Sequence, residues 1–167
     1  MKNRKPNRMQ GFDYSSDNLY FVTSCVRGME CCFGEISASR MELNNYGKIA
    51  EKQWYWLGEQ YPYIILHAFV VMPNHIHGII EINRGQIPIK IKSLSELMGA
   101  YKTTVSKQIH LSDGIRTDRS QPVPATTFAW HRSFHEHIIR DEKSFEKISD
   151  YIANNPINWK QDKFYNL

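Results

Sequence analysis

Short apolar runs in this chain alternate with segments of helical spacing, and the runs predict the strands of a sheet. Residues 19–26, 64–72 and 75–82 are rich in β-branched and aromatic side chains, which is typical of strands. A Pro-Asn pair separates the second run from the third, which indicates an antiparallel hairpin. Residues 128–139 are also expected to be extended.

Three other segments carry apolar side chains at helical spacing. Residues 44–60 form an imperfect amphipathic pattern, and residues 93–109 form a clearer one. A last helix is expected to begin after Asp141, which can cap it, and to stop at Pro156. Residues 112–127 are rich in Ser, Thr, Asp, Gly and Pro and are expected to form a long exposed loop.

The order of these elements is strand, helix, strand, strand, helix, strand, helix. It matches the split βαβ pattern of a ferredoxin-like or RRM-like sandwich, which is an α+β fold. In such a fold an antiparallel sheet is covered on one face by two helices. We therefore expect the other face of the sheet to be left available.

The hairpin predicts which side chains share a face, because side chains in a strand alternate with period two. Across a two-residue Pro-Asn turn, the expected pairs are Met72 with His75, Val70 with His77, Ala68 with Ile79 and Leu66 with Glu81. The opposite, core face would hold Ile65, His67, Phe69, Val71, Ile76, Gly78, Ile80 and Ile82. The two histidines therefore lie together on the face away from the covering helices.

Two imidazoles side by side on a strand can form half of a metal site. Packed or surface histidines are an equally ordinary explanation of such a pair, so a third ligand and a nucleophile are needed to decide. A nucleotide hydrolase of the histidine-triad type would need a third histidine at position 79, which is Ile79.

The last helix offers two further polar groups. Tyr151 and Asn155 are four residues apart, hence separated by about 40° around a helix. Tyr151 lies at the edge of the apolar stripe, where its ring can pack while its hydroxyl reaches a site. Without the histidine pair, these two residues would be explained by structure alone. Tyr151 would lie at the boundary of the buried face, and Asn155 would end the helix before Pro156.

Composition limits the class of protein. The chain has 167 residues with 41% hydrophobic content, which fits one domain over residues 15–167. No apolar run is long enough for a membrane span and no secretory signal is visible, so we expect a cytoplasmic protein. The cysteines, Cys25, Cys31 and Cys32, have no spacing typical of a disulfide framework or a zinc site.

The positive charge is concentrated at the start of the chain. The net charge is +4, and Lys2, Arg4, Lys5 and Arg8 account for all of it. Residues 1–14 are therefore interpreted as a basic arm, which could contact phosphates or could simply be solvated.

Three motifs in this order resemble a known family. They are residues 72–77 (MPNHIH), 130–140 (WHRSFHEHIIR) and 150–156 (DYIANNP). They are similar to motifs of the REP-associated tyrosine transposases, single-tyrosine HUH nucleases related to the transposases of small single-strand insertion sequences. The resemblance implies a ferredoxin-like fold with a catalytic C-terminal helix, a metal pair at His75 and His77, and a nucleophile at Tyr151. It places Asn155 where the family has a polar third ligand, often the longer Gln.

The chemistry implied by the resemblance is transesterification of DNA. Mg²⁺ or Mn²⁺ would withdraw charge from a phosphate oxygen while the Tyr151 phenolate attacks phosphorus, giving a 5′-phosphotyrosine and a free 3′-OH. A second 3′-OH could then rejoin the strand without ATP. Transposition of DNA by a sequence- and hairpin-specific single-strand endonuclease and strand transferase is the expected function.

The resemblance also implies the partner, single-stranded DNA with a hairpin and a short flanking tetranucleotide. Candidate DNA contacts are Tyr20, Lys90, Lys92, Lys102, Lys107, Arg116, Arg119, Trp130, Arg132 and Arg140. Insertion-sequence relatives are dimers that share active sites, whereas the REP-associated branch resembles monomers, so a monomer is favoured and a homodimer remains open.

Two alternatives accompany this interpretation. The chain could be a ferredoxin-like nucleic-acid-binding module without catalysis. A rival nucleophile, Tyr101, is expected in the core because of its apolar helical neighbours. His135 and His137 alternate in the last expected strand, and we interpret them as structural or DNA-facing.

Overall fold

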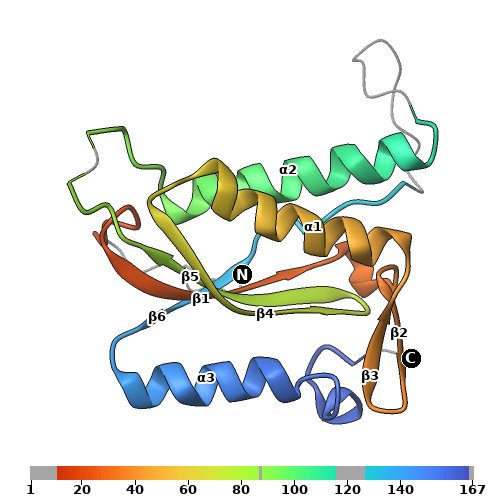
Figure 1. Ribbon diagram of the computed structural model, residues 1–167. Coiled ribbons are helices and arrows are strands. Elements are labelled where there is room, and N and C mark those ends of the chain that lie inside the picture. The colour runs from red at the N-terminus through yellow and green to blue at the C-terminus, as the bar shows by residue number, and fades with distance from the viewer. Residues whose placement is uncertain (1–10, 87, 116–126, 166–167) are drawn as a thin grey trace, which may run out of the picture.

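A four-stranded antiparallel sheet forms the middle layer of the protein (Figure 1). Its order is β4-β5-β1-β6, from strands β1 (Asn18–Cys25), β4 (Ile64–Met72), β5 (His75–Ile82) and β6 (His135–Ile139). The computed structural model describes residues 11–86, 88–115 and 127–165. This order is that of a ferredoxin-like sandwich, so the expected α+β fold is confirmed.

Helices α1 (Asn45–Gln60) and α2 (Leu94–Ser112) cover one face of the sheet, as expected (Figure 1). The side chain of Asn44 caps α1, and Ser93 with Glu96 forms a capping box at α2. Both helices bury their apolar stripes against the sheet. The core they form includes Trp54 and Tyr101, both without exposed surface.

The β4–β5 hairpin has the expected pairing near the turn but not further along. Met72 pairs with His75 and Val70 with His77, whereas Leu66 pairs with Ile80 instead of Glu81. The register shifts between Leu66 and Phe69 because two residues of β4 occupy the space opposite one residue of β5, which is a β-bulge.

The bulge reverses the faces predicted for the first part of β4. Ile65, expected in the core, pairs with Glu81 and is 46% exposed. His67 was also assigned to the core face, but its Nε2 lies 2.8 Å from Glu81 Oε2 and its ring contacts Phe145 of the last helix. Both predictions were wrong because an extra residue in a strand exchanges inward and outward positions.

The second face of the sheet is not available, contrary to expectation. Helix α3 (Glu142–Asn154) lies across it, on the opposite side from α1 and α2 (Figure 1). Its apolar side chains, Phe145, Ile148 and Ile152, pack with Ile79 and Ile139 of the sheet. This small second core fixes α3 directly below the strand that carries the two histidines.

Two further features depart from the predicted elements. A hairpin that the sequence pattern did not reveal, β2 (Gly34–Ser37) with β3 (Arg40–Leu43), stands at the end of the sheet near the C-terminal segment (Figure 1). Only residues 135–139 of the expected extended segment 128–139 form a strand, although Trp130 makes an isolated bridge to Val26.

Several predictions concern chain outside the described residues. They include the basic side chains of the arm up to Arg8 and most of the loop at 112–127, with Arg116 and Arg119. In the part of the chain that the structure describes, no helix combines the length and apolar character needed to cross a bilayer. Cys25, Cys31 and Cys32 are free thiols.

Candidate active site

The two histidines of β5 are held by hydrogen bonds to their Nδ1 atoms. Nδ1 of His75 lies 2.7 Å from Oδ1 of Asn74, and Nδ1 of His77 lies 2.7 Å from Oγ1 of Thr23 on β1. The amide nitrogen of Asn74 donates to the backbone oxygens of Met29 and Phe164, so its Oδ1 is the acceptor for His75. The proton of His75 is therefore on Nδ1, and its Nε2 carries a lone pair.

The Nε2 atoms of His75 and His77 face each other at 3.0 Å. Both side chains are buried, with 0% and 1% exposure. Burial lowers the pKa of His75 to about 4, and it lowers the pKa of His77 well below the ordinary value. The positive charge of Lys163 acts in the same direction on both rings. Both imidazoles are therefore neutral at physiological pH, as metal ligands must be.

Tyr151 of α3 reaches this pair from the other side. Its hydroxyl lies 3.3 Å from Nε2 of His77 and 3.3 Å from a carboxylate oxygen of Asp162. Partial burial, followed by the charge and hydrogen bond of Asp162, raises the pKa of Tyr151 to about 12. The side chain remains 41% exposed, so it can reach both the site and a bound molecule.

Asn155 lies one turn after Tyr151, at the end of α3. Its amide nitrogen donates to Oδ2 of Asp162 at 2.8 Å. Its Oδ1 is buried and has no hydrogen-bond partner among the described residues. A buried carbonyl oxygen without a partner is costly, and a ligand at this point would satisfy it.

Asp162 brings a carboxylate that the sequence pattern did not single out. One ligand atom from each of His75, His77 and Asp162 lies within 4.8 Å of the others, a set that can hold a metal ion. Asp162 follows the 3₁₀ turn η2 (Trp159–Gln161), beyond Pro156 and outside any periodic segment. No signal in the sequence could have found it, because only the fold of the C-terminal segment brings it back to β5.

The C-terminal segment also closes the site against solvent. The ring of Phe164 lies 4.6 Å from that of His75, and the ring of Trp159 lies 6.0 Å away, centroid to centroid. The backbone oxygen of Phe164 accepts a hydrogen bond from Asn74, the residue that orients His75. Residues 159–164 are therefore a wall of the site.

The arrangement fits a divalent cation. Two neutral imidazoles, a carboxylate and an unsatisfied amide oxygen make a mixed nitrogen and oxygen donor set, which suits Mn²⁺ and related ions. Partners at Nδ1 of each histidine are typical of metal-binding imidazoles. Beside this set stands a tyrosine hydroxyl, which is a nucleophile once deprotonated.

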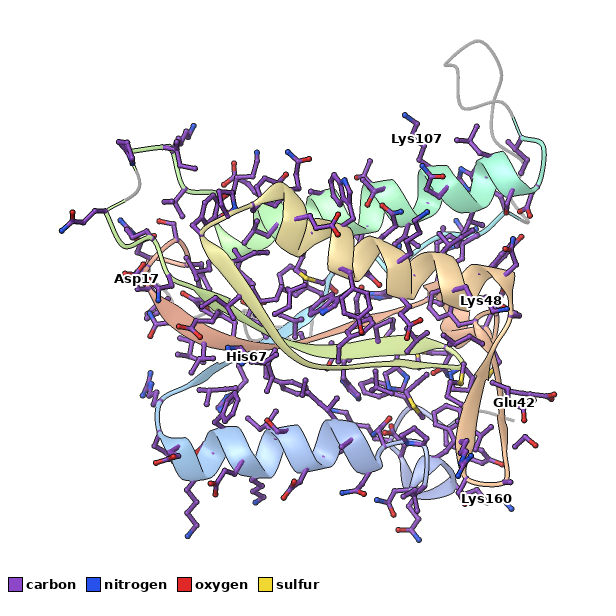
Figure 2. The ribbon with its side chains drawn as sticks, in the orientation of Figure 1. Asp17, Glu42, Lys48, His67, Lys107 and Lys160 are labelled. Atoms are coloured by element: carbon purple, nitrogen blue, oxygen red, sulfur yellow. The ribbon has the colours of Figure 1, made fainter. Side chains whose placement is uncertain are left out.

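The candidate DNA contacts are not gathered in one place. Lys107 lies on α2, on the side of the sheet opposite α3 and Lys160 (Figure 2). Lys90 and Lys92 precede α2, and Arg140 follows β6. The ammonium group of Lys102 donates to the backbone oxygens of His131 and Arg132, at 2.6 and 3.2 Å.

The remaining sequence candidates fall in the core or beside the site. Trp130 is 8% exposed and packs against Phe33, Tyr101 and Phe128, so it offers no open face to a base. Tyr20 is also fully buried, and Tyr101 donates to the backbone oxygen of Ala50 in the core.

The two histidines of β6 flank the site across β1. His135 pairs with Thr23, the partner of His77, and His137 pairs with Phe21, whose ring contacts His77 and Tyr151.

Comparison with known proteins identifies relatives along the whole chain. The sequence pattern of the family described as "Transposase IS200 like" matches residues 57–155. A protein of Haemophilus influenzae (strain ATCC 51907 / DSM 11121 / KW20 / Rd), described as uncharacterized, is 34% identical over 167 residues, covering 97% of this chain and 93% of that one. A second protein of the same strain, provisionally named a REP-associated tyrosine transposase, is 24% identical over 145 residues, covering 87% and 73%.

A solved structure supports the fold. A REP-associated tyrosine transposase bound to a REP hairpin superposes with a TM-score of 0.57 at 19% identity, covering 98% of this chain and 77% of that one. At this identity the likeness concerns the fold.

Proposed function

Because this chain belongs to the IS200-like transposase family, we propose that it is a metal-dependent, hairpin-specific single-stranded DNA endonuclease and strand transferase. The main observation behind this proposal is that the Tyr151 hydroxyl lies 3.3 Å from Nε2 of His77 and 3.3 Å from Oδ2 of Asp162. This distance supports a role for Tyr151 as the nucleophile beside the proposed metal ligands. The hairpin bound by the related transposase supports the proposed substrate.

In the proposed site His75, His77 and Asn155 would hold Mg²⁺ or Mn²⁺, and Asp162 would offer a fourth ligand. The cation supplies charge withdrawal from a phosphate oxygen. Thr23 and Asn74 orient the two imidazoles, and Phe164 and Trp159 keep bulk water away from them. A dry site strengthens each of these electrostatic contacts.

The proposed reaction has two transesterification steps. The deprotonated Tyr151 oxygen attacks phosphorus, and the bond from phosphorus to the 3′ oxygen breaks, so that the 3′ oxygen leaves and gains a proton. The product is a 5′-phosphotyrosine and a free 3′-OH. In the second step a 3′-OH attacks the same phosphorus, and the bond from phosphorus to the Tyr151 oxygen breaks. The attacking hydroxyl gives up its proton, the Tyr151 hydroxyl is regenerated, and the number of phosphodiester-type bonds is unchanged. The positive charge of Lys163 acts on both imidazoles, so it would also favour a phosphate anion bound beside them.

We further propose that the protein acts as a monomer. Tyr151 reaches His77 within one chain, so the site needs no residue from a second copy. A homodimer would be expected to exchange the helix that carries the nucleophile. Size-exclusion chromatography with light scattering, run with and without hairpin DNA, distinguishes the two states.

The catalytic proposal is tested by trapping the covalent intermediate. Single-stranded hairpin oligonucleotides are incubated with the protein and Mn²⁺, and adducts are separated on a denaturing gel. Adducts should form with the native chain and with Tyr55→Phe, a matched change on α1 where the ring is 57% exposed. They should be absent with Tyr151→Phe. DNA binding without adducts from any hairpin would favour the alternative, a non-catalytic binding module.

A further inference from the structure

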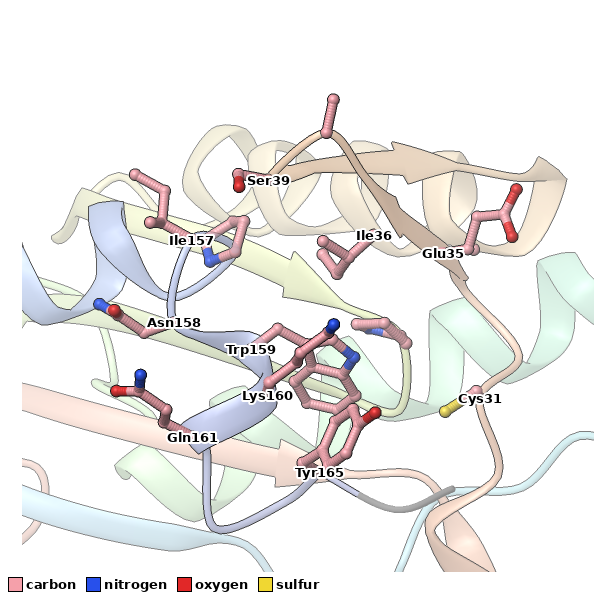
Figure 3. Close-up of a pocket in the computed structure, with 14 residues that line it drawn as sticks. Cys31, Glu35, Ile36, Ser39, Ile157, Asn158, Trp159, Lys160, Gln161 and Tyr165 are labelled. Carbon is pink, nitrogen blue, oxygen red and sulfur yellow. The ribbon is translucent and has the colours of Figure 1, made fainter.

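A cavity of about 670 Å³ opens next to the candidate active site. One side is the β2–β3 hairpin, with Ile36 pointing inward, and the other is the C-terminal stretch from Pro156 to Gln161 with Tyr165 (Figure 3). The carboxylate of Glu35 points away from the Trp159 ring in this view. The volume is in the range of pockets that bind small organic groups.

The cavity and the active site share a wall. Trp159 lines the cavity, and its ring centroid lies 6.0 Å from that of His75. Two other lining residues are sequence neighbours of site residues. Pro73 precedes Asn74, which orients His75, and Pro156 follows Asn155. A molecule in the cavity would therefore be separated from His75, a proposed metal ligand, by the ring of Trp159.

The lining combines flat apolar surface with amide edges. The ring of Trp159 is itself buried at the back of the cavity, with Tyr165 edge-on to it at 5.2 Å and 81°. The apolar surface open to a ligand therefore comes from Tyr165 and from Ile157, which is 62% exposed at the rim. Asn158 and Gln161 each carry an amide donor and an acceptor, and Lys160 adds a positive charge. Stacking surface, paired hydrogen-bonding groups and a cation are what a nucleobase with its phosphate requires.

We propose that this cavity binds one unpaired nucleobase of the DNA strand, close to the phosphate that Tyr151 attacks. The inference rests on the proposed function and adds a base-binding site to it. An unpaired base fits better than a duplex, because the β2–β3 hairpin and the C-terminal stretch enclose the cavity from two sides and only a base outside a stack can enter. The site would contribute to the choice of flanking nucleotide.

The test measures DNA binding separately from cleavage. The probe is a fluorescein-labelled DNA hairpin with thymidine flanks, bound to full-length Tyr151→Phe protein and followed by fluorescence anisotropy. Adding Ile157→Ala and Gln161→Ala should weaken binding about fivefold or more, the effect expected from losing contacts to one base. The matched controls, Ile65→Ala on β4 and Gln60→Ala at the end of α1, are exposed side chains outside the cavity and should leave binding unchanged.

Abasic substitution along the flanks then locates the base. In the Tyr151→Phe protein, one flanking position should give a loss similar to that of the cavity changes. In the cavity variant, the same abasic position should cause no further loss. Two results would overturn the base site. One is a cavity variant that binds the hairpin as tightly as the Tyr151→Phe protein, and the other is an abasic position that weakens binding to the cavity variant as well. If adducts form at Tyr151 while the cavity changes have no effect, the proposed function stands and only this inference fails.

Discussion

The hydroxyl of Tyr151 and the carboxylate of Asp162 are 3.3 Å apart, although one belongs to α3 and the other to the segment after η2. The same carboxylate accepts a hydrogen bond from Asn155 and lies among the histidine ligand atoms. Asp162 thus contacts the proposed nucleophile and also belongs to the group of side chains that could hold a metal ion. This double contact makes it the most informative residue to change.

Burial is the main reason that the pKa of Tyr151 is about 12, and the Asp162 charge raises it further. Asp162→Asn removes that charge and is therefore expected to lower the pKa. It should also weaken Mn²⁺ binding by about tenfold or more, as expected for a lost anionic contact to a metal site. Tyrosinate absorbance against pH, taken as the difference from the matching Tyr151→Phe protein, gives the pKa. Titration calorimetry gives the affinity for Mn²⁺.

Asp150→Asn is the control for this change, since Asp150 is the exposed neighbour of Tyr151 on α3. The pKa of Tyr151 and the affinity for Mn²⁺ should both stay at their native values in this variant. An Asp162→Asn protein with native Mn²⁺ affinity would show that the carboxylate is no ligand.

Thr23→Val is expected to weaken metal binding without unfolding the protein. Thr23 is buried and pairs with His77 across strands β1 and β5, and its Oγ1 is the hydrogen-bond partner of Nδ1 of His77. Loss of such a partner typically costs about 10- to 100-fold in metal affinity. Mn²⁺ affinity by calorimetry is the measurement, and Thr23→Ser, which keeps the hydroxyl, should restore most of it. Equal affinities for the Val and Ser variants would contradict an orienting role.

The metal-free protein is expected to lose stability in acid through its buried histidines. The pKa of His75 is about 4 in the folded chain, against an ordinary value of 6.5, and that of His77 is lowered in the same direction. Between these values the unfolded chain binds more protons than the folded one, so the free energy of unfolding falls as pH drops from about 6.5 towards 4. Above that window the contribution is fully present.

Urea unfolding in EDTA at neutral and at mildly acidic pH measures this effect. The double variant His75→Leu, His77→Leu lacks the two titrating groups, so its urea midpoint should change less between the two conditions. A variant as sensitive to acid as the native chain would show that other groups cause the loss.

Gly78→Ala is expected to destabilise the fold by about 1–3 kcal/mol, the usual cost of overpacking a core. Gly78 follows His77, and a Cβ at this position would overlap the ring of Trp54, which stacks on Phe69 at 4.4 Å. Thermal or urea unfolding measures the change. Gly99→Ala on α2 is the matched control, because a Cβ there meets no atom within 4 Å and a helical glycine costs about 0.5–1 kcal/mol relative to alanine. Gly99→Ala should therefore stabilise the protein.

Local patterns were sufficient for most elements of the fold. The bounds of β4 and β5, the presence of α1 and α2, and the start of α3 after its cap Asp141 follow from alternation, helical spacing and a capping side chain, all of which act over a few residues. The pairing of Val70 with His77 followed from the short turn. The bulge beyond Leu66 did not, because a bulge has no fixed local signature and depends on how the strand fits its neighbours.

By itself, the sequence determined most of the elements and the family, and it put His75 and His77 on one face because the side-chain period of a strand is a local property. The tertiary structure decided what meets that face. It placed α3 over the sheet, brought Tyr151 and Asn155 to the histidines, and returned Asp162 from beyond Pro156. The contacts of Tyr151 and Asp162 with the histidines join segments more than seventy residues apart. Their geometry is set by the packing of apolar side chains such as Ile79 against Ile152, which the periodicity of the sequence does not predict.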